Sequence, residues 1–106
     1  MAPATAKGPN EVIHQSVRLK IMAALHGLPA GEAIEFPRLK AVVEATDGNL
    51  GAHLATLENA GYITVDKDFN GKKPRTRIAL TRAGRTAFAD HVAYLRDILD
   101  ASRPPD

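Results

Sequence analysis

The sequence predicts a mainly helical α+β fold with one small sheet, and three observations point to it. Apolar residues recur at helical spacing over most of the chain, two short stretches change to the alternating period of strands, and an Asn-Gly pair lies between those stretches. No internal repeat or long linker interrupts the 106 residues, so we expect one domain.

The first helix is expected over residues 11–28. Its apolar side chains return every three or four residues, as on one face of an amphipathic helix: Ile13, Val17, Ile21, Ala24, Leu25 and Leu28. Leu19 and Met22 form a second apolar line beside that face, which fits either a partner surface or a wide buried face. A Gly- and Pro-rich stretch then ends the helix.

Two short helices should follow, separated by a tight turn. Residues 33–35 read as a short strand, and Pro37 suits the first turn of a second helix that ends near Ala45. Thr46 is a good N-cap for the third helix, and Asp47 in its first turn favours the helix dipole. The third helix should turn its leucines inward and a small, polar face outward, with His53 at the border: Leu50, Leu54 and Leu57 against Gly48, Asn49, Ala52, Thr56 and Asn59.

A hairpin and a last helix complete the predicted order. After Gly61 the apolar period changes to that of strands, around residues 62–65 and again around 76–80, and the loop 69–75 between them has a basic tip. Thr81 caps a helix that runs to about Ala101. That helix carries two adjacent apolar stripes, more than one small core needs: Phe88, Val92, Leu95 and Leu99, and Ala87, His91, Tyr94 and Ile98.

Positive charge is concentrated in one third of the chain. The formal net charge is only +2, but residues 67–85 carry seven basic residues against the single acid Asp68, a local balance of +6 that leaves about −4 elsewhere. A basic patch of this kind is typical of a surface that meets nucleic acid.

This order of elements matches a helix-turn-helix followed by a wing, the winged helix-turn-helix. A third helix with small and hydrogen-bonding side chains fits the major groove, and its N-terminal amides attract phosphate. Asn49 would read an adenine edge or hold a phosphate; the alternative is that it only helps to cap the helix. The basic residues of the hairpin would neutralise phosphates or enter the minor groove, the alternative being a solvated charged turn.

The sequence also resembles the stand-alone winged-helix regulators related to the MarR and ArsR families, over roughly residues 12–100. Three runs carry the resemblance: Arg18-Leu19-Lys20-Ile21-Met22, the stretch from Thr46-Asp47-Gly48-Asn49-Leu50 to Ala60-Gly61-Tyr62-Ile63, and Leu80-Thr81-Arg82-Ala83-Gly84-Arg85. It implies a recognition helix over 46–60, a wing over 69–77, and a dimer made by the first and last helices. Many relatives have a Ser and a basic residue where this chain has Gly51 and Ala52, which favours phosphate or shape readout over base readout.

Several other classes of function find no support. The absence of cysteine excludes disulfides, thiolate metal sites and cysteine nucleophiles. The four histidines are scattered without metal-ligand spacing, and no phosphate loop or nucleophile motif is present, so we expect no metal, no cofactor and no enzyme activity. No signal peptide or membrane anchor is recognised, so the expected location is the cytoplasm, on the nucleoid.

The sequence therefore predicts a homodimeric transcriptional regulator, a repressor in our interpretation, that binds double-stranded DNA in a sequence-dependent way. The alternative is a winged-helix protein-interaction module without specific DNA binding, and a small-molecule effector at the dimer interface is a further hypothesis. The predicted domain spans 11–101, between tails at 1–10 and 102–106. The expected DNA contacts are Arg38, Thr46, Asn49, His53, Thr56, Lys72, Lys73, Arg75 and Arg77. The expected dimer contacts are Leu19, Met22, Phe88, His91, Val92, Tyr94, Leu95, Ile98 and Leu99.

Overall fold

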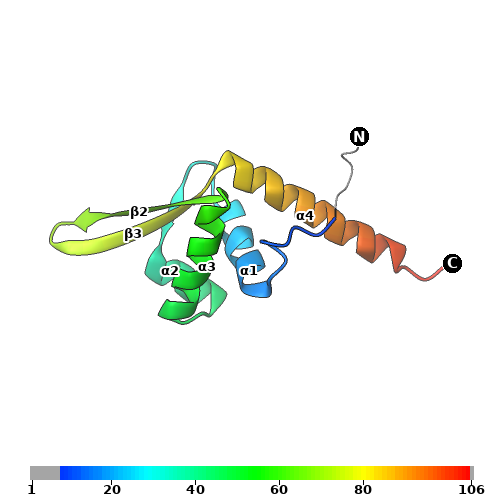
Figure 1. Ribbon diagram of the computed structural model, residues 1–106, viewed down its shortest axis with the longest axis horizontal. Coiled ribbons are helices and arrows are strands. Elements are labelled where there is room, and N and C mark those ends of the chain that lie inside the picture. Colours follow the sequence, from blue (N-terminus) through cyan, green and yellow to red (C-terminus); the bar gives the residue numbers. More distant parts are fainter. Residues whose placement is uncertain (1–7, 106) are drawn as a thin grey trace.

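The computed structural model describes residues 8–105 and contains the predicted order of elements (Figure 1). These are α1 (Ser16–His26), β1 (Ala33–Glu35), α2 (Phe36–Val43), α3 (Asp47–Asn59), β2 (Ile63–Asn70), β3 (Lys73–Leu80) and α4 (Arg82–Ala101). The predicted winged helix-turn-helix is confirmed. Residues 1–7, most of the predicted N-terminal tail, lie outside the described residues.

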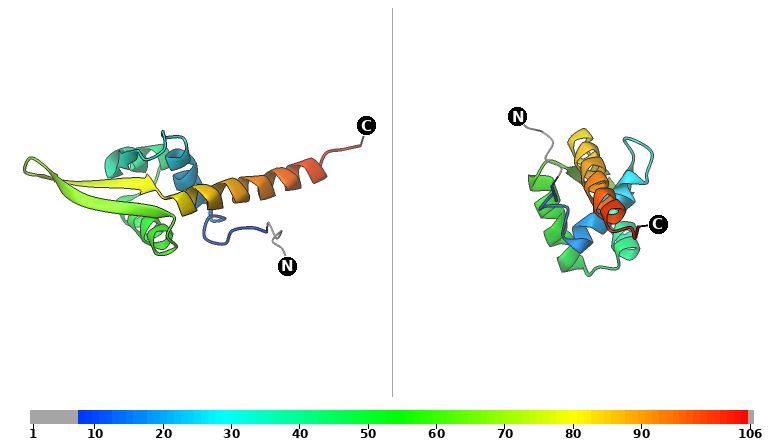
Figure 2. Two further views of the ribbon diagram at one scale, coloured as in Figure 1. Left: turned by 90° about the horizontal axis from the view of Figure 1, so that it is seen from above. Right: turned by 90° about the vertical axis from the view of Figure 1, so that its right-hand side faces the viewer.

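The molecule is elongated because two elements project from opposite ends of the core. The hairpin β2–β3 extends from one end and the second half of α4 from the other (Figures 1 and 2). The principal extents are 60 × 31 × 24 Å, and the radius of gyration is 15.7 Å. A compact domain of this length would have a radius of gyration of about 13 Å.

The sheet has the order β1-β3-β2, with both pairings antiparallel. Its central strand places Ile78 opposite Ile34 on one side and opposite Val65 on the other. Ile78 is fully buried, so the β-branched pairs fix the register on the face that packs against the helices.

The core is made mainly by leucine and isoleucine side chains of α1, α2, α3 and the sheet, and α4 adds Phe88. Met22 is fully buried and Leu19 packs partly against the same core, so the second apolar line of α1 belongs to a wide buried face. The fully buried members of the core are Ile13, Ile21, Met22, Leu25, Leu39, Leu50, Leu57 and Ile78.

Helix α1 begins at Ser16 rather than at residue 11, and the predicted start was wrong. The side chain of Asn10 accepts hydrogen bonds from the backbone N–H groups of Val12 and Ile13, which fold the chain into a turn there. The Gln15 side chain then caps α1 by accepting from the N–H of Arg18 at 2.9 Å. Amide side chains compete with the helix for these backbone donors, and apolar periodicity does not report that competition.

The start of α4 is locked to the end of β3 and to the corner between α3 and β2. The Thr81 hydroxyl accepts from the N–H of Gly84 at 3.0 Å and donates to the carbonyl of Gly61 at 2.7 Å, while the N–H of Thr81 donates to the carbonyl of Tyr62 at 3.0 Å. Gly84 is buried against this corner, where a Cβ would lie 2.1 Å from the Tyr62 carbonyl oxygen. The Leu-Thr-x-x-Gly run of the sequence is therefore a packing requirement.

Replacing Gly84 by Ala should destabilise the protein by about 1–3 kcal/mol, because the added methyl group meets backbone that cannot move aside cheaply. Ala is otherwise the better helix residue by about 1 kcal/mol, so propensity alone predicts the opposite sign. Chemical denaturation measures the free energy of unfolding.

Gly51→Ala in the exposed face of α3 is the matched control, since nothing lies within 4 Å of its added Cβ. It should stabilise slightly. If Gly84→Ala were as stable as Gly51→Ala, the close approach at the α4 start would be disproved.

Candidate nucleic-acid interface

The N-terminal half of α3 presents exposed polar groups on a well-formed cap. Thr46 accepts from the backbone N–H of Asn49 at 3.2 Å, as expected for an N-cap, and both side chains are exposed. The cap uses the backbone of Asn49, so its side-chain amide is not consumed by capping. Asn49 therefore remains available to a ligand at the positive end of the helix dipole.

The exposed surface of α3 is small as well as polar. Thr56 is exposed, and its hydroxyl donates back to the carbonyl of Ala52 at 3.3 Å, which leaves the methyl group and the oxygen lone pairs outward. Gly48, Gly51, Ala52 and Ala55 are exposed around it. A helix with such short side chains can approach another surface closely.

The wing is a tight two-stranded ribbon. Asn70 of β2 pairs with Lys73 of β3, so only Gly71 and Lys72 form the turn, and Gly71 adopts a φ of 67°. A positive φ in a two-residue turn suits glycine, which explains the Asn-Gly signal. The ribbon is therefore regular almost to its tip, where the sequence analysis expected a longer loop.

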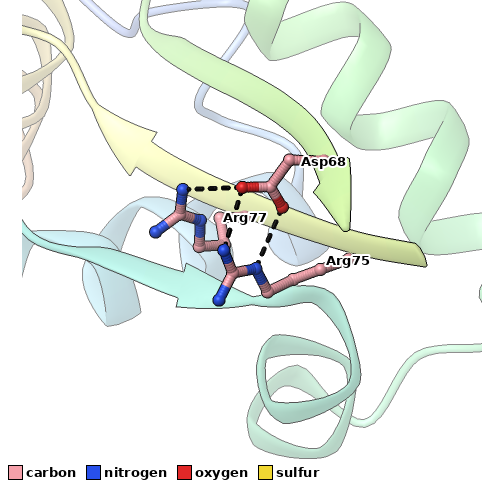
Figure 3. A network of polar contacts seen from close by, with 3 residues as sticks. All are labelled: Asp68, Arg75 and Arg77. Atoms are coloured by element: carbon pink, nitrogen blue, oxygen red, sulfur yellow. Dashed lines mark hydrogen bonds and ion pairs between the residues drawn. The ribbon is translucent and has the colours of Figure 1, made fainter. Parts of the chain in front are cut away.

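Asp68 holds the two wing arginines from across the ribbon (Figure 3). Its carboxylate accepts from Nε and Nη2 of Arg75 at 2.9 Å each and from Nη2 of Arg77 at 3.1 Å. The hydrogen bonds from Arg75 are the main cause of a lowered pKa at Asp68. The expectation that Arg75 and Arg77 are free to meet phosphate needs correction: both are engaged within the wing, because the register places Asp68 opposite Arg75.

The unpaired positive charge of the wing lies on lysines. Lys67, Lys72 and Lys73 are exposed, and the structure shows no ion pair for them among the described residues. Phe69, which the sequence analysis did not single out, is 68% exposed and pairs in register with Pro74 near the tip. The tip thus combines cations with one large apolar side chain.

The two charged residues of α2, Arg38 and Lys40, lie in different surroundings. Arg38, a predicted DNA contact, is exposed in a hollow with Leu28 and β1 rather than beside α3. Lys40, which was not predicted, forms an ion pair with Asp47 at 2.7 Å and so adds a cation at the start of α3. Only the fold, and not the pattern of α2, distinguishes these two positions.

The predicted dimer residues divide into a buried set, a half-buried set and an exposed set; of the half-buried ones, Leu19 and Val92 pack against the core. Met22, Phe88 and His91 are 0%, 9% and 1% exposed, so placing them at an interface was wrong for this chain: they pack inside it. His91 accepts from the backbone N–H of Asn10 at Nδ1, 3.2 Å away, and burial is the main cause of its lowered pKa.

The exposed set lies on the projecting end of α4. Ile98 and Leu99 are 47% and 65% exposed, and Leu95 and Tyr94 are half-buried just before them. This end extends beyond the helical core (Figure 2). None of the helices over residues 8–105 is long and apolar enough to cross a lipid bilayer.

One interaction joins α1 to the border of α3. The guanidinium Nη1 of Arg18 lies 3.1 Å from Nδ1 of His53, and both side chains are half-buried. Sequence analysis placed His53 near DNA but did not connect it with Arg18, which is 35 residues away along the chain.

Comparisons with known proteins agree with this geometry. A family model described as a winged helix DNA-binding domain matches residues 17–99. An uncharacterized protein from Methanocaldococcus jannaschii is 38% identical over 93 residues, which cover 88% of this chain and 95% of that protein.

Solved structures share the architecture. The transcriptional regulator homologue protein from Pyrococcus horikoshii OT3 superposes with a TM-score of 0.78 at 26% identity and covers 87% of this chain and 88% of that chain. A putative transcriptional regulator of the MarR family from Porphyromonas gingivalis W83 has a TM-score of 0.65 at 16% identity, with 94% of each chain covered. The second likeness concerns the fold alone.

Replacing Asp68 by Ala should loosen the outer half of the wing, because Arg75 and Arg77 lose their shared acceptor and repel each other. Backbone amides of residues 67–75 should exchange hydrogen faster, while the unfolding midpoint hardly changes, since the wing contributes little to the core. Hydrogen exchange followed by NMR measures both.

Asp66→Ala is the matched control, because Asp66 lies opposite Arg77 in the strand register but accepts no hydrogen bond from either arginine. In the wild type, the pKa of Asp68 is lower in the folded state than its ordinary 3.8. Protection of the wing should therefore be complete above that value and be lost as the pH falls through the lowered pKa. Equal exchange in the two variants would contradict the role given to Asp68.

Proposed function

The chain belongs to the winged helix DNA-binding domain family, and from this premise we propose that it is a transcriptional regulator that binds double-stranded DNA as a homodimer. The observation that carries the proposal is that the polar surface of α3 and the lysine-tipped wing are neighbours, at the end of the molecule opposite the projecting α4. A hollow lined by Gly51, Ala55, Lys67 and Thr76 connects the two.

In this proposal α3 enters the major groove. The groove of B-DNA is about 12 Å wide and admits a helix, and short side chains let the helix backbone come close to the bases. Asn49 is the residue proposed to read a base edge, because its amide is exposed and can both donate and accept. Thr46 lies at the same helix start and suits a phosphate contact, whereas Lys40 is already paired with Asp47.

The wing is proposed to lie against the DNA backbone beside the minor groove. Lys72 and Lys73 supply the positive charge that phosphates attract, with Lys67 further along the ribbon. Phe69 is proposed to pack on the sugar edges of the groove, since apolar side chains are frequent there. Asp68, Arg75 and Arg77 give the ribbon its stiffness, so of the four wing residues predicted to contact phosphate, Lys72 and Lys73 are the ones proposed to do so.

The homodimer is proposed to form through the projecting end of α4. Within the described chain Ile98 and Leu99 are exposed and Leu95 is only half-buried, and two such helices would bury each other's apolar stripe. Two recognition helices in one dimer would then meet half-sites about one helical turn apart. Repression and a small-molecule effector remain predictions from the sequence, as does the domain limit at residue 11.

The wing lysines provide the direct test of DNA binding. Changing Lys72 and Lys73 to Ala should weaken binding to all duplexes and lower the slope of log affinity against log salt by about 0.9 per lost phosphate contact, because fewer counterions are released. Fluorescence anisotropy over a salt series measures the slope. Lys20→Ala with Arg103→Ala is the control, since it removes the same charge from exposed positions outside the wing.

Asn49→Ala should instead change which sequences are selected from a random duplex pool, while leaving the salt slope nearly intact. A protein that binds no duplex in the pool would contradict the proposal and favour a protein-interaction module. So would a salt slope that the wing variant leaves unchanged.

A further inference from the structure

Arg18 is held at two points between α1 and α3. Its Nε–H donates to the carbonyl oxygen of Val12, which fixes the guanidinium against the turn before α1. Its Nη1 then reaches Nδ1 of His53 at 3.1 Å. A guanidinium with two anchors has little freedom left, so it can fix the orientation of the imidazole that it touches.

The chemistry of this contact determines the protonation of His53. Arginine carries only donors and stays charged at all relevant pH values, so Nδ1 of His53 has to be the acceptor. The single proton of the neutral ring is then on Nε2. A second proton on Nδ1 would break the hydrogen bond and place two cations face to face. Burial, and next the charge of Arg18, accordingly lower the pKa of His53.

The remaining Nε2–H lies on the side of α3 that carries the candidate DNA contacts. His53 is four residues after Asn49 and three before Thr56, so the three side chains are neighbours on one side of the helix. No described residue accepts a hydrogen bond from this Nε2–H, and Nε2 is not among the buried polar atoms that lack a partner, so it is open to solvent. A donor fixed in this way, and not used within the chain, is suited to an external acceptor.

We propose that Arg18 is a positioning residue that holds His53 as the neutral Nε2–H tautomer, so that α3 offers a hydrogen-bond donor to an acceptor atom of duplex DNA. The acceptor is a phosphate oxygen or an acceptor atom of a base edge in the major groove, such as a purine N7. The inference rests on the proposed DNA binding, but the tautomer itself is a property of the free protein.

A neutral donor differs from the lysines of the wing in one measurable respect. The wing lysines release counterions when they meet phosphate, whereas an uncharged imidazole releases none. His53 should therefore contribute affinity that does not depend on salt. Its contribution should also be constant above the ordinary histidine pKa of 6.5, because the lowered pKa of His53 keeps the ring neutral there.

The tautomer is tested first, by heteronuclear NMR of the imidazole nitrogens in isotope-labelled free protein. The wild type should show a protonated Nε2 and an unprotonated Nδ1 above the ordinary histidine pKa of 6.5. Among the described residues, Arg18 is the charged group that faces the His53 ring. Arg18→Met keeps the aliphatic stem and removes every donor. It should therefore give mixed tautomers and a higher pKa at His53. Lys20→Met, which removes a charge from an exposed position of the same helix, should change neither.

DNA binding is tested next. His53→Leu should lower affinity by about tenfold, the effect of one good hydrogen bond, with the salt slope unchanged. His53→Gln, which has an N–H donor at nearly the same place, should restore most of the loss. A loss that is equal for all duplexes identifies a phosphate acceptor, and a changed preference at one base pair identifies a base-edge acceptor.

The outcomes separate the two proposals. If the wild type shows a protonated Nδ1 or a charged ring at neutral pH, the positioning role of Arg18 is wrong whatever the protein binds. If the tautomer is as expected and the wing lysines matter for DNA, but His53→Leu binds as tightly as the wild type, the donor role is wrong. If the protein binds no duplex, the proposed function fails, and with it the donor role, while the tautomer result stands.

Discussion

The close packing of Gly84 on the Tyr62 carbonyl is the constraint from which the arrangement of the two ends follows. At this corner Thr81 caps α4 with one hydroxyl and ties it to Gly61, the residue with a φ of 82° that ends the α3 turn. The end of α3, the start of β2, the end of β3 and the start of α4 therefore meet within a few residues. The directions of the wing and of α4 are set together, and neither can turn without opening a backbone hydrogen bond.

The two ends of the molecule consequently have separate surfaces and separate kinds of chemistry. At one end, exposed lysines and small polar side chains of α3 suit an anionic surface of fixed shape. At the other, the exposed part of α4 carries the apolar side chains of Ile98 and Leu99 among charged residues, and this apolar pair suits a second copy. The Asn10 side chain bonds the Tyr62 hydroxyl at 2.9 Å, and its backbone bonds His91, so the segment before α1 braces both α4 and the corner.

Several features governed by neighbours in sequence were predicted correctly, although the start of α1 was not, and the pairings between distant residues were not predicted. The caps at Thr46 and Thr81, the turn at Gly71 and the leucine face of α3 each follow from a few adjacent residues. The pairing of Asp68 with Arg75 depends on strand register, and that of Arg18 with His53 on the packing of α1 against α3. Likewise, Phe88 and Leu99 belong to the same apolar stripe of α4 in the sequence, but the fold buries Phe88 and leaves Leu99 exposed.

The central claim is that two copies of this chain, joined at α4, bind one DNA duplex through α3 and the wing. Sedimentation velocity of the protein with a duplex recovered from a random pool tests it most directly, because it gives the number of chains per duplex. Two chains on one duplex are expected, and nuclease footprinting of the same complex should show protected half-sites about 10 base pairs apart. One chain per duplex at saturation, or a single undivided footprint, would contradict it.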